Sequence, residues 1–450
     1  MSELHRPNLH FSPMNGWMND PNGLIRLDSV WHMFFQHHPD GIDHDDIHWG
    51  HAVSHDLLSW EERPIALAPD QMGTCFSGSA VETPDGDVKI FYTAHSLTPE
   101  GRDHQVQCLV HADRSLTKSA RDYRNPILPN PGREAFRDPK VIWHEQTSRW
   151  IMLVTLGQEI GIYSSTDLVD WRFESRFGEA DISYRGGVWE CPDLLRFDDG
   201  DGGEVWVLIV GVQSGAANGG SGTMYFIGDF DGQRFENHGD PDQMLWMDRG
   251  RDFYAAQGFF DRAGGEPVVM AWISNWDYAR ETPTKAFRGV MSLPRILSLV
   301  NTPKGRRLRQ NLPEQVLNKL KSSSVSSGTY GFAKTFEMVE GDRTAILLFG
   351  SETPQFVLSR KAAATGVIHC HRDEHPDMQN FGHDLSIEFD WPMEETLELQ
   401  FYVDRGVVEL SAMDGTLWVT NLFYPEDPGG EVRILPNKNT TTQLKEIVHG

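Results

Sequence analysis

The hydrophobic residues of this chain fall in short runs that are rich in β-branched and aromatic side chains and are separated by Gly, Asp and Pro. Such a pattern is typical of β-strands joined by turns, and long stretches with helical periodicity are scarce. The best helix candidate is NLPEQVLNKLKSS, at residues 311–323. The chain is therefore predicted to be all-β apart from this short helix.

Five segments repeat one order of features: a small or acidic opening, an apolar strand, a polar turn and a second apolar strand. They begin at Asn19, Phe76, Phe136, Trp189 and Phe253, which are 57, 60, 53 and 64 residues apart. A single hairpin cannot bury its apolar face, whereas hairpins arranged around an axis can. Residues 1–305 are therefore predicted to form a five-bladed β-propeller. An irregular β-sandwich is the alternative, because hairpins recur in any β protein.

The composition changes after the fifth segment. Residues 306–324 are first basic and then rich in Ser, which indicates a linker that contains the short helix. Residues 325–450 again alternate between polar and apolar positions, and Asp414-Gly415 is a hairpin turn signal. This C-terminal part is predicted to be a β-sandwich domain.

Charge and cysteine content exclude several classes of protein. Lys and Arg total 40 while Asp and Glu total 65, so the formal net charge is −25, which disfavours nucleic acid and anionic membranes as partners. The four cysteines are scattered, so neither a disulfide framework nor a zinc site is indicated, and no cofactor is expected. No export signal is visible, so we expect a cytoplasmic protein, or a secreted one if a signal was removed. The sequence makes no prediction of an oligomeric state.

Three of the five repeat openings carry a carboxylate: Asp20, Asp138 and Glu190. Asp before Pro is commonly only a turn residue, but equivalent positions of propeller repeats face the same central channel. Clustered carboxylates repel one another, and a pair of them is the apparatus of glycoside hydrolysis. A one-residue slip turns a strand side chain to the other face, so spacing alone does not choose between Glu190 and Asp193.

Two other features of the sequence bear on its chemistry. Residues 37–55 are rich in His and Asp but lack the spacing of a metal-binding motif, so a polar loop is favoured and no metal is predicted. Trp17, Trp49 and Trp276 lie beside the polar openings, where indole rings could stack on a sugar.

Seven motifs, in order along the chain, resemble glycoside hydrolase family 32: WMNDPNG, HWGHAVSHDLLSW, FSGSAV, FRDPKV, WECPDL, DFYAAQ and RGVMSLPR. The resemblance implies a five-bladed propeller followed by a sandwich, and a retaining mechanism without a metal. It assigns Asp20 as the nucleophile and Glu190, rather than Asp193, as the acid/base. Asp138 would hold the hydroxyl groups of a fructosyl unit.

The resemblance also implies the substrate. The chain would release terminal β-D-fructofuranosyl units from sucrose, fructo-oligosaccharides or fructans, and Asn19, Gln36, Trp49, Ser77 and Arg137 match positions that bind the fructosyl unit in the family. Two aromatic residues are added as candidate substrate-binding residues: Phe76, which precedes Ser77, and Trp276, which lies beside a polar opening. Three alternatives are a fructosyltransferase that uses the same residues, an inverting furanosidase, and a sugar-binding propeller without catalysis. The intact pair of Asp20 and Glu190 argues against the last one, because a lectin needs neither a nucleophile nor an acid.

Overall fold

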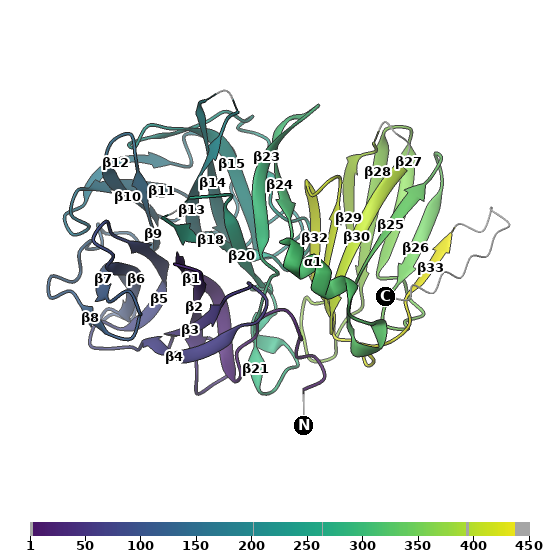
Figure 1. Ribbon diagram of the computed structural model, residues 1–450, viewed down its shortest axis with the longest axis horizontal. Helices are drawn as coiled ribbons and strands as arrows, with labels where there is room; N and C mark the ends of the chain where they lie inside the picture. Colours follow the sequence, from purple (N-terminus) through teal and green to yellow (C-terminus); the bar gives the residue numbers. More distant parts are fainter. Residues whose placement is uncertain (1–2, 201, 263, 393–395, 437–450) are drawn as a thin grey trace.

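The computed structural model describes residues 3–436 except residues 201, 263 and 393–395. Within these residues the strands form seven sheets. Five sheets are arranged around one axis as the blades of a propeller, and two face each other as a sandwich (Figure 1). The predicted five-bladed propeller followed by a β-sandwich is confirmed.

Each blade begins with its innermost strand. The first blade contains β1 (Gly16–Leu27), β2 (Val30–His38), β3 (His48–Ser54) and β4 (Glu61–Leu67). The second contains β5 (Thr74–Glu82), β6 (Val88–Leu97), β7 (Asp103–Ala112) and β8 (Ser119–Arg121). The third contains β9 (Arg137–His144), β10 (Arg149–Thr155), β11 (Ile160–Ser165) and β12 (Arg172–Phe177).

The last two blades have additional short strands. The fourth contains β13 (Trp189–Asp198), β14 (Glu204–Val212), β15 (Gly222–Phe230), β16 (Phe235–Asn237) and β17 (Leu245–Trp246). The fifth contains β18 (Tyr254–Gly258), β20 (Val268–Ile273), β22 (Val290–Met291), β23 (Arg295–Thr302) and β24 (Gly305–Asn311). Two short strands, β19 (Phe260–Asp261) and β21 (Phe287–Arg288), follow β18 and β20 and pair in parallel with β1. They tie the end of the propeller to its beginning.

A separate hydrophobic cluster fills each gap between neighbouring blades. Phe34 and Tyr92 belong to the cluster between the first and second blades. Phe11 and Met270 belong to the cluster that joins the first blade to the fifth. The innermost strands β1, β5, β9, β13 and β18 contact one another in a closed ring. Each blade therefore buries its apolar faces against its neighbours, which is the physical reason the hairpin repeat predicts a radial array.

The last strand of the propeller, β24, extends beyond the predicted end of the domain at residue 305. Residues 306–311 are part of a regular antiparallel pair with β23, so they do not act as a linker. Arg307 and Arg309 alternate with buried Leu308 and Gln310 and are themselves partly exposed, which makes the segment look like a linker in composition. The predicted helix follows as α1 (Glu314–Lys321), which packs Val316 and Leu320 against Trp418. α1 has 8 residues and is the longest helix in the described part of the chain, where none could cross a membrane.

The sandwich lies beyond α1 and the short 3-10 helix η2 (Val325–Ser327). One sheet contains β25 (Thr329–Glu337), β30 (Thr396–Asp404), β31 (Val407–Ala412) and β32 (Leu417–Leu422). The other contains β26 (Arg343–Leu347), β27 (Phe356–Ala362), β28 (Thr365–Arg372), β29 (His383–Asp390) and β33 (Arg433–Pro436). The final residues of the predicted domain, 437–450, lie outside the described residues. A second 3-10 helix, η1 (Ala279–Glu281), belongs to the propeller.

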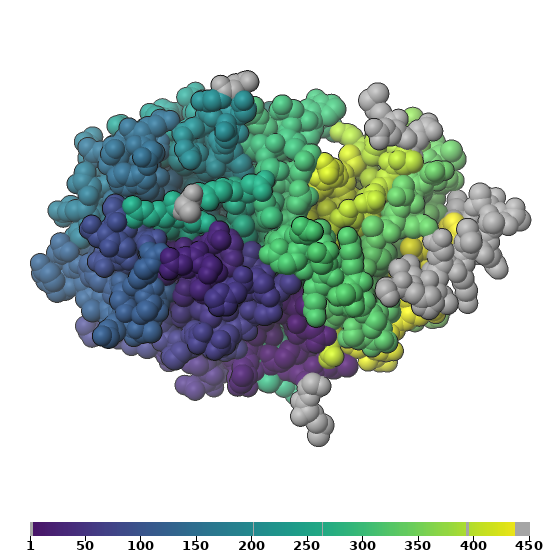
Figure 2. All heavy atoms as spheres, viewed as in Figure 1, coloured from purple at the N-terminus to yellow at the C-terminus, as the bar shows by residue number. Residues whose placement is uncertain are grey.

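The two domains pack closely against each other (Figure 2), and a buried charge network joins them. Arg295 of the propeller contacts Asp248 at 3.0 Å and also pairs with Glu409 of the sandwich. His10, which precedes the first blade, contacts Asp404 at 2.9 Å and Glu409 at 3.0 Å. Burial alone would lower the pKa of His10, but these two carboxylates outweigh it and raise the pKa to about 9. His10 is therefore charged at neutral pH and joins the N-terminal segment to the sandwich.

The His10 contacts predict how stability depends on pH. The pKa of His10 rises from 6.5 to about 9 on folding. Its contribution to the free energy of unfolding is therefore fully present below pH 6.5 and is lost as the pH rises through 9. The shift corresponds to about 3 kcal/mol. We expect His10→Gln to lower the melting temperature at pH 7 and to reduce the loss of stability between pH 7 and pH 10. Thermal unfolding across this pH range measures both effects. His55→Gln, at an exposed position, is the control, and equal pH slopes for His10→Gln and the wild type would contradict the assignment.

Candidate active site

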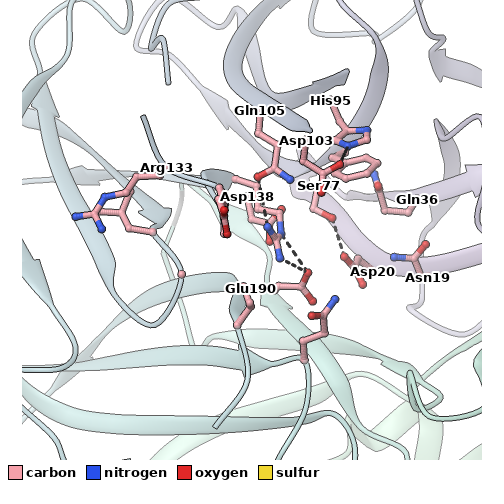
Figure 3. Close-up of a pocket in the computed structure, with 18 of the residues that line it drawn as sticks. Asn19, Asp20, Gln36, Ser77, His95, Asp103, Gln105, Arg133, Asp138 and Glu190 are labelled. Carbon is pink, nitrogen blue, oxygen red and sulfur yellow. Dashed lines mark hydrogen bonds and ion pairs between the residues drawn. The ribbon is translucent and has the colours of Figure 1, made fainter. Parts of the chain in front are cut away.

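A pocket of about 780 Å³ opens where four of the innermost strands, β1, β5, β9 and β13, begin. Asp20 on β1, Asp138 on β9 and Glu190 on β13 all line it, although they are far apart in sequence (Figure 3). The structure thus brings together the three acids that the sequence singled out. Their separate blades converge because each innermost strand contacts the next around the ring.

Each innermost strand has an irregularity in its pairing at the level of the pocket. Asp20 has no paired residue on β2, because the β1 residues on either side of it pair with two consecutive residues of β2. Ser77 is extra on β5 in the same way. On β9, Asp138 lies within such a bulge and has φ +64°, a value that non-glycine residues rarely adopt. Bulges redirect side chains, and here they turn short carboxylates and a hydroxyl towards the axis.

The bulges also resolve the register of the three acids, which the spacing of the sequence left open. In β9 the last paired residue before the bulge is Arg137, and in β13 it is Glu190. Cys191, with φ +48°, occupies the position that corresponds to Asp138. Glu190 therefore lies one residue before the position that Asp20 and Asp138 hold, which is the one-residue offset that the spacing of the sequence left open. Its side chain is one methylene longer than that of aspartate and lines the same pocket from the preceding residue.

Asp20 is nearly enclosed, with 7% of its surface exposed. Its Oδ2 accepts a hydrogen bond of 2.7 Å from the Ser77 hydroxyl and lies 3.3 Å from the Cys191 thiol. Its Oδ1 is buried without a hydrogen-bond partner among the described residues. Burial, followed by the negative charge of Glu190, raises the pKa of Asp20, while hydrogen bonds from Ser77 and its neighbours oppose the rise. One oxygen is thus held in place, and the other is buried with no hydrogen-bond partner in the described part of the chain.

Asp138 lies beside the same thiol. Its Oδ2 accepts the backbone N–H of Cys191 at 2.8 Å and is 3.7 Å from Cys191 Sγ. Burial is the largest cause that raises the pKa of Asp138 to about 7; the charges of Glu190 and Asp20 act in the same direction, and the charge of Arg137 opposes them. The pocket therefore resists holding several negative charges at once, as expected for carboxylates that share a desolvated space.

Glu190 is held at both of its oxygens. The guanidinium group of Arg137 donates to Oε1 from Nε at 3.1 Å and from Nη2 at 2.8 Å. The Tyr254 hydroxyl donates to Oε2. Burial by itself would lower the pKa of Arg137, but the carboxylates of Glu190 and Asp138 raise it, so the arginine stays charged. These contacts fix the orientation of the Glu190 carboxyl group.

Asp193, the alternative to Glu190, has a different place. It is fully buried and its Oδ2 pairs with Lys140 Nζ at 2.8 Å. The same oxygen accepts the backbone N–H of Gly258 at 2.6 Å. Glu190 lines the pocket, whereas Asp193 lies deeper along β13 and is neutralised by a lysine. This geometry favours Glu190 as the acid of the site.

Most of the predicted substrate-binding residues line the pocket: Asn19, Gln36, Phe76, Ser77, Arg137 and Trp276. Trp49 does not lie with them. It is fully buried behind the wall, where its indole N–H donates to the Phe76 carbonyl at 3.0 Å and its ring packs against Phe34. Trp17 is also fully buried, and it supports the pocket by stacking on Trp276 with 6.0 Å between ring centroids. Trp49 and Trp17 are expected from the sequence to stack directly on a sugar. Both are instead buried and support the wall of the pocket.

Several pocket residues were not predicted from the sequence: His44, His95, Asp103, Gln105, Arg133 and Arg280. They come from later strands of the blades and from loops, where the hairpin repeat gives no signal. His95 stacks on Phe76 with 4.3 Å between centroids and contacts Asp103 at 2.9 Å. His44 belongs to the His- and Asp-rich loop. Among the described residues, no group of three His, Cys, Asp or Glu side chains is arranged to hold a metal ion.

Comparison with known families identifies both domains. Residues 10–311 match the glycosyl hydrolases family 32 N-terminal domain, and residues 304–449 match the family 32 C-terminal domain. The chain is 43% identical over 336 residues to a levanase of Bacillus subtilis (strain 168), a match that covers 72% of this chain and 49% of the levanase. It therefore spans about half the length of that relative. It is 31% identical to the extracellular exo-inulinase inuE of Aspergillus niger, over 99% of this chain and 94% of the inulinase.

Solved structures agree with the sequence comparison. The exo-inulinase of Aspergillus awamori superposes with a TM-score of 0.83 at 28% identity, covering 97% of this chain and 96% of the other. The β-fructofuranosidase of Schwanniomyces occidentalis, solved with fructosyl-erythritol, gives a TM-score of 0.81 at 29% identity, covering 99% and 96%. The likeness extends over both domains.

Proposed function

Because the chain belongs to glycoside hydrolase family 32, we propose that it is a retaining β-fructofuranosidase that releases terminal fructosyl units from sucrose or fructans. The observation that carries the proposal is that Asp20 and Glu190 line one pocket, with one oxygen of the Asp20 carboxylate lacking a hydrogen-bond partner among the described residues. The names of the relatives, which are levanase and exo-inulinase, support a fructoside as the substrate.

The first half of the proposed reaction forms a covalent intermediate. The free oxygen of Asp20 attacks the anomeric carbon C2 of the terminal fructosyl unit, and the glycosidic C2–O bond breaks. Glu190 gives its proton to the departing oxygen, so the leaving group departs as a neutral alcohol. Asp138 and Arg137, which line the same pocket, are suited to hold the sugar hydroxyl groups.

The second half releases fructose. Glu190, now ionised, takes a proton from water as the water oxygen attacks C2, and the ester bond to Asp20 breaks. The Asp20 carboxylate is thereby restored. Hydrolysis is favoured over transfer to another sugar because the named relatives are hydrolases. The presence of both a nucleophile, Asp20, and an acid, Glu190, argues against a sugar-binding protein without catalysis.

A product screen tests this proposal. Sucrose, sucrose 6-phosphate, inulin and levan are incubated with the protein, and free fructose and longer oligosaccharides are quantified by chromatography. We expect free fructose from sucrose and from at least one fructan. Longer oligosaccharides as the main products would favour a fructosyltransferase instead, and the absence of any fructose from all four would refute the proposal.

Tyr254 is expected to act as a positioning residue for Glu190. Tyr254→Phe removes the hydroxyl group that donates to Glu190 Oε2 and leaves the ring in place. Because hydrogen bonds to charged groups contribute about 1.5–3 kcal/mol, we expect kcat to fall about 10- to 100-fold. The comparison is with Tyr225→Phe, another buried tyrosine, whose oxygen contacts the Leu308 backbone N–H at 3.3 Å. Equal kcat values for the two variants, at equal melting temperatures, would rule out this role.

A further inference from the structure

A second cavity of about 600 Å³ lies at the opposite end of the innermost strands, and we call it the rear cavity. On β9, Asp138 faces the active-site pocket while Lys140 and Trp143, further along the strand, line the rear cavity. On β13, Glu190 lines the active-site pocket and Asp193 lines the rear cavity. The two sets of lining residues have no member in common. A volume of this size is within the usual range for small-molecule sites, about 300–1,000 Å³.

An ion pair closes the inner end of the rear cavity. Lys140 Nζ contacts Asp193 Oδ2 at 2.8 Å, the Gly258 carbonyl at 2.9 Å and Gln257 Oε1 at 3.3 Å. Three hydrogen bonds use the full capacity of an ammonium group. The floor is therefore polar but satisfied, and it offers no net charge to an ionic ligand. Along β9 and β13, the Lys140–Asp193 pair lies between the active-site pocket and the rear cavity. It therefore separates a ligand in one cavity from a ligand in the other.

The wall of the rear cavity presents a fixed aromatic ring. Trp143 is partly exposed, and its indole N–H donates to Glu145 Oε2 at 2.6 Å. The ring of Trp150 holds it edge to face at 5.1 Å. Leu195 and Phe260, also partly exposed, continue the apolar surface. A rigid indole with a polar edge is a common platform for the face of a sugar ring.

The rim carries charges of both signs at close spacing. Glu204 pairs with Arg196, and Arg262 donates to the Thr83 carbonyl. Carboxylates only accept hydrogen bonds and guanidinium groups only donate them, whereas a sugar hydroxyl does both. An ionic ligand would meet a like charge on one side of this rim. A neutral polyhydroxyl ligand matches both sides.

We propose that the rear cavity is a second saccharide-binding site for neutral fructosyl oligosaccharides. The identity of the sugar rests on the proposed function, while the existence of a neutral-sugar site rests on Trp143, the satisfied floor and the mixed rim. The carboxylate on the floor, Asp193, is neutralised by Lys140 and is not free to act on a ligand. We assign this site binding without cleavage, and fructose release from sucrose does not require it.

Calorimetric titration with a fructosyl trisaccharide tests the proposal. The starting protein is Asp20→Asn, which should bind without turnover, and we expect two sites per chain. Adding Trp143→Ala should weaken one site about tenfold or more and leave the other unchanged. Adding Leu195→Trp fills the rear cavity but keeps the ring of Trp143. This variant should abolish binding at the same site. Phe173→Ala, an exposed aromatic position on β12 with 45% exposure, is the control and should keep both.

The outcomes separate this inference from the proposed function. A single site in Asp20→Asn, unaffected by Trp143→Ala and Leu195→Trp, overturns the rear site and leaves the enzyme assignment intact. Binding to neither cavity, together with no fructose release by the wild type, overturns both. In the wild-type background, Trp143→Ala should keep kcat/KM for sucrose within about twofold. A larger loss would show that Trp143 acts on the fold or the active site instead.

Discussion

Replacing Asp20 with asparagine is expected to abolish fructose release, with kcat/KM for sucrose lowered by on the order of 10⁴-fold or more. Asparagine has nearly the same shape and still offers an oxygen to the Ser77 hydroxyl, which donates to Asp20 Oδ2. It lacks the charge needed to form an ester with C2. Steady-state kinetics and thermal unfolding of the same sample give activity and stability together.

The same substitution should not weaken the fold. Burial and the charge of Glu190 raise the pKa of Asp20, which means that its ionised form is less favourable in the folded protein than in the unfolded chain. Above that pKa the charge opposes folding, so removing it should leave the melting temperature equal or higher. The matched control is Asp193→Asn, which leaves buried Lys140 without its carboxylate partner and should lower the melting temperature. A large loss of stability in Asp20→Asn would point to a structural role for Asp20.

Replacing Glu190 with alanine should produce a loss of activity that depends on the leaving group. For sucrose, whose leaving oxygen must be protonated, we expect kcat/KM to fall about 10²–10⁴-fold. For a fructoside with an acidic phenol as leaving group, which departs without protonation, the first step should remain fast and the release of fructose should become slow. A burst of phenol followed by a slow steady state measures this difference.

The control for Glu190 is Glu134→Ala. Glu134 lines the outer part of the same pocket and is exposed, so its removal changes the local charge without removing the acid. Equal losses for sucrose and for the activated fructoside in Glu190→Ala would contradict its role as the acid. Such a result would be expected if Glu190 served only to hold Arg137, which donates two hydrogen bonds to it.

The sequence was sufficient to predict the architecture and the meeting of Asp20, Asp138 and Glu190 in one pocket, because the hairpin repeat is a direct consequence of how blades bury their faces. Phe34 and Tyr92, for example, recur as apolar positions of successive hairpins and meet between two blades. Family membership and the assignment to the glycoside hydrolases are confirmed by the matches over both domains.

Other parts of the site could not be predicted from a strand pattern. The bulges at Asp138 and Cys191 shift the register by one residue, and such irregularities depend on the contacts of the whole ring. Trp49 and Trp276 look alike in sequence, yet only Trp276 reaches the pocket. His95 lies on β6 and Arg133 lies in a loop. Their positions in the pocket therefore depend on how the second and third blades pack.

The central claim is that Asp20 becomes covalently attached to the fructosyl unit while Glu190 serves as acid and base. The most direct test is mass spectrometry of Glu190→Ala after incubation with an activated fructoside and a rapid acid quench, because this variant should form the ester and hydrolyse it slowly. We predict that a peptide containing Asp20 gains the mass of one fructosyl group. A fructosyl group found on another residue, or none in a sample that has released its full burst of phenol, would contradict the account.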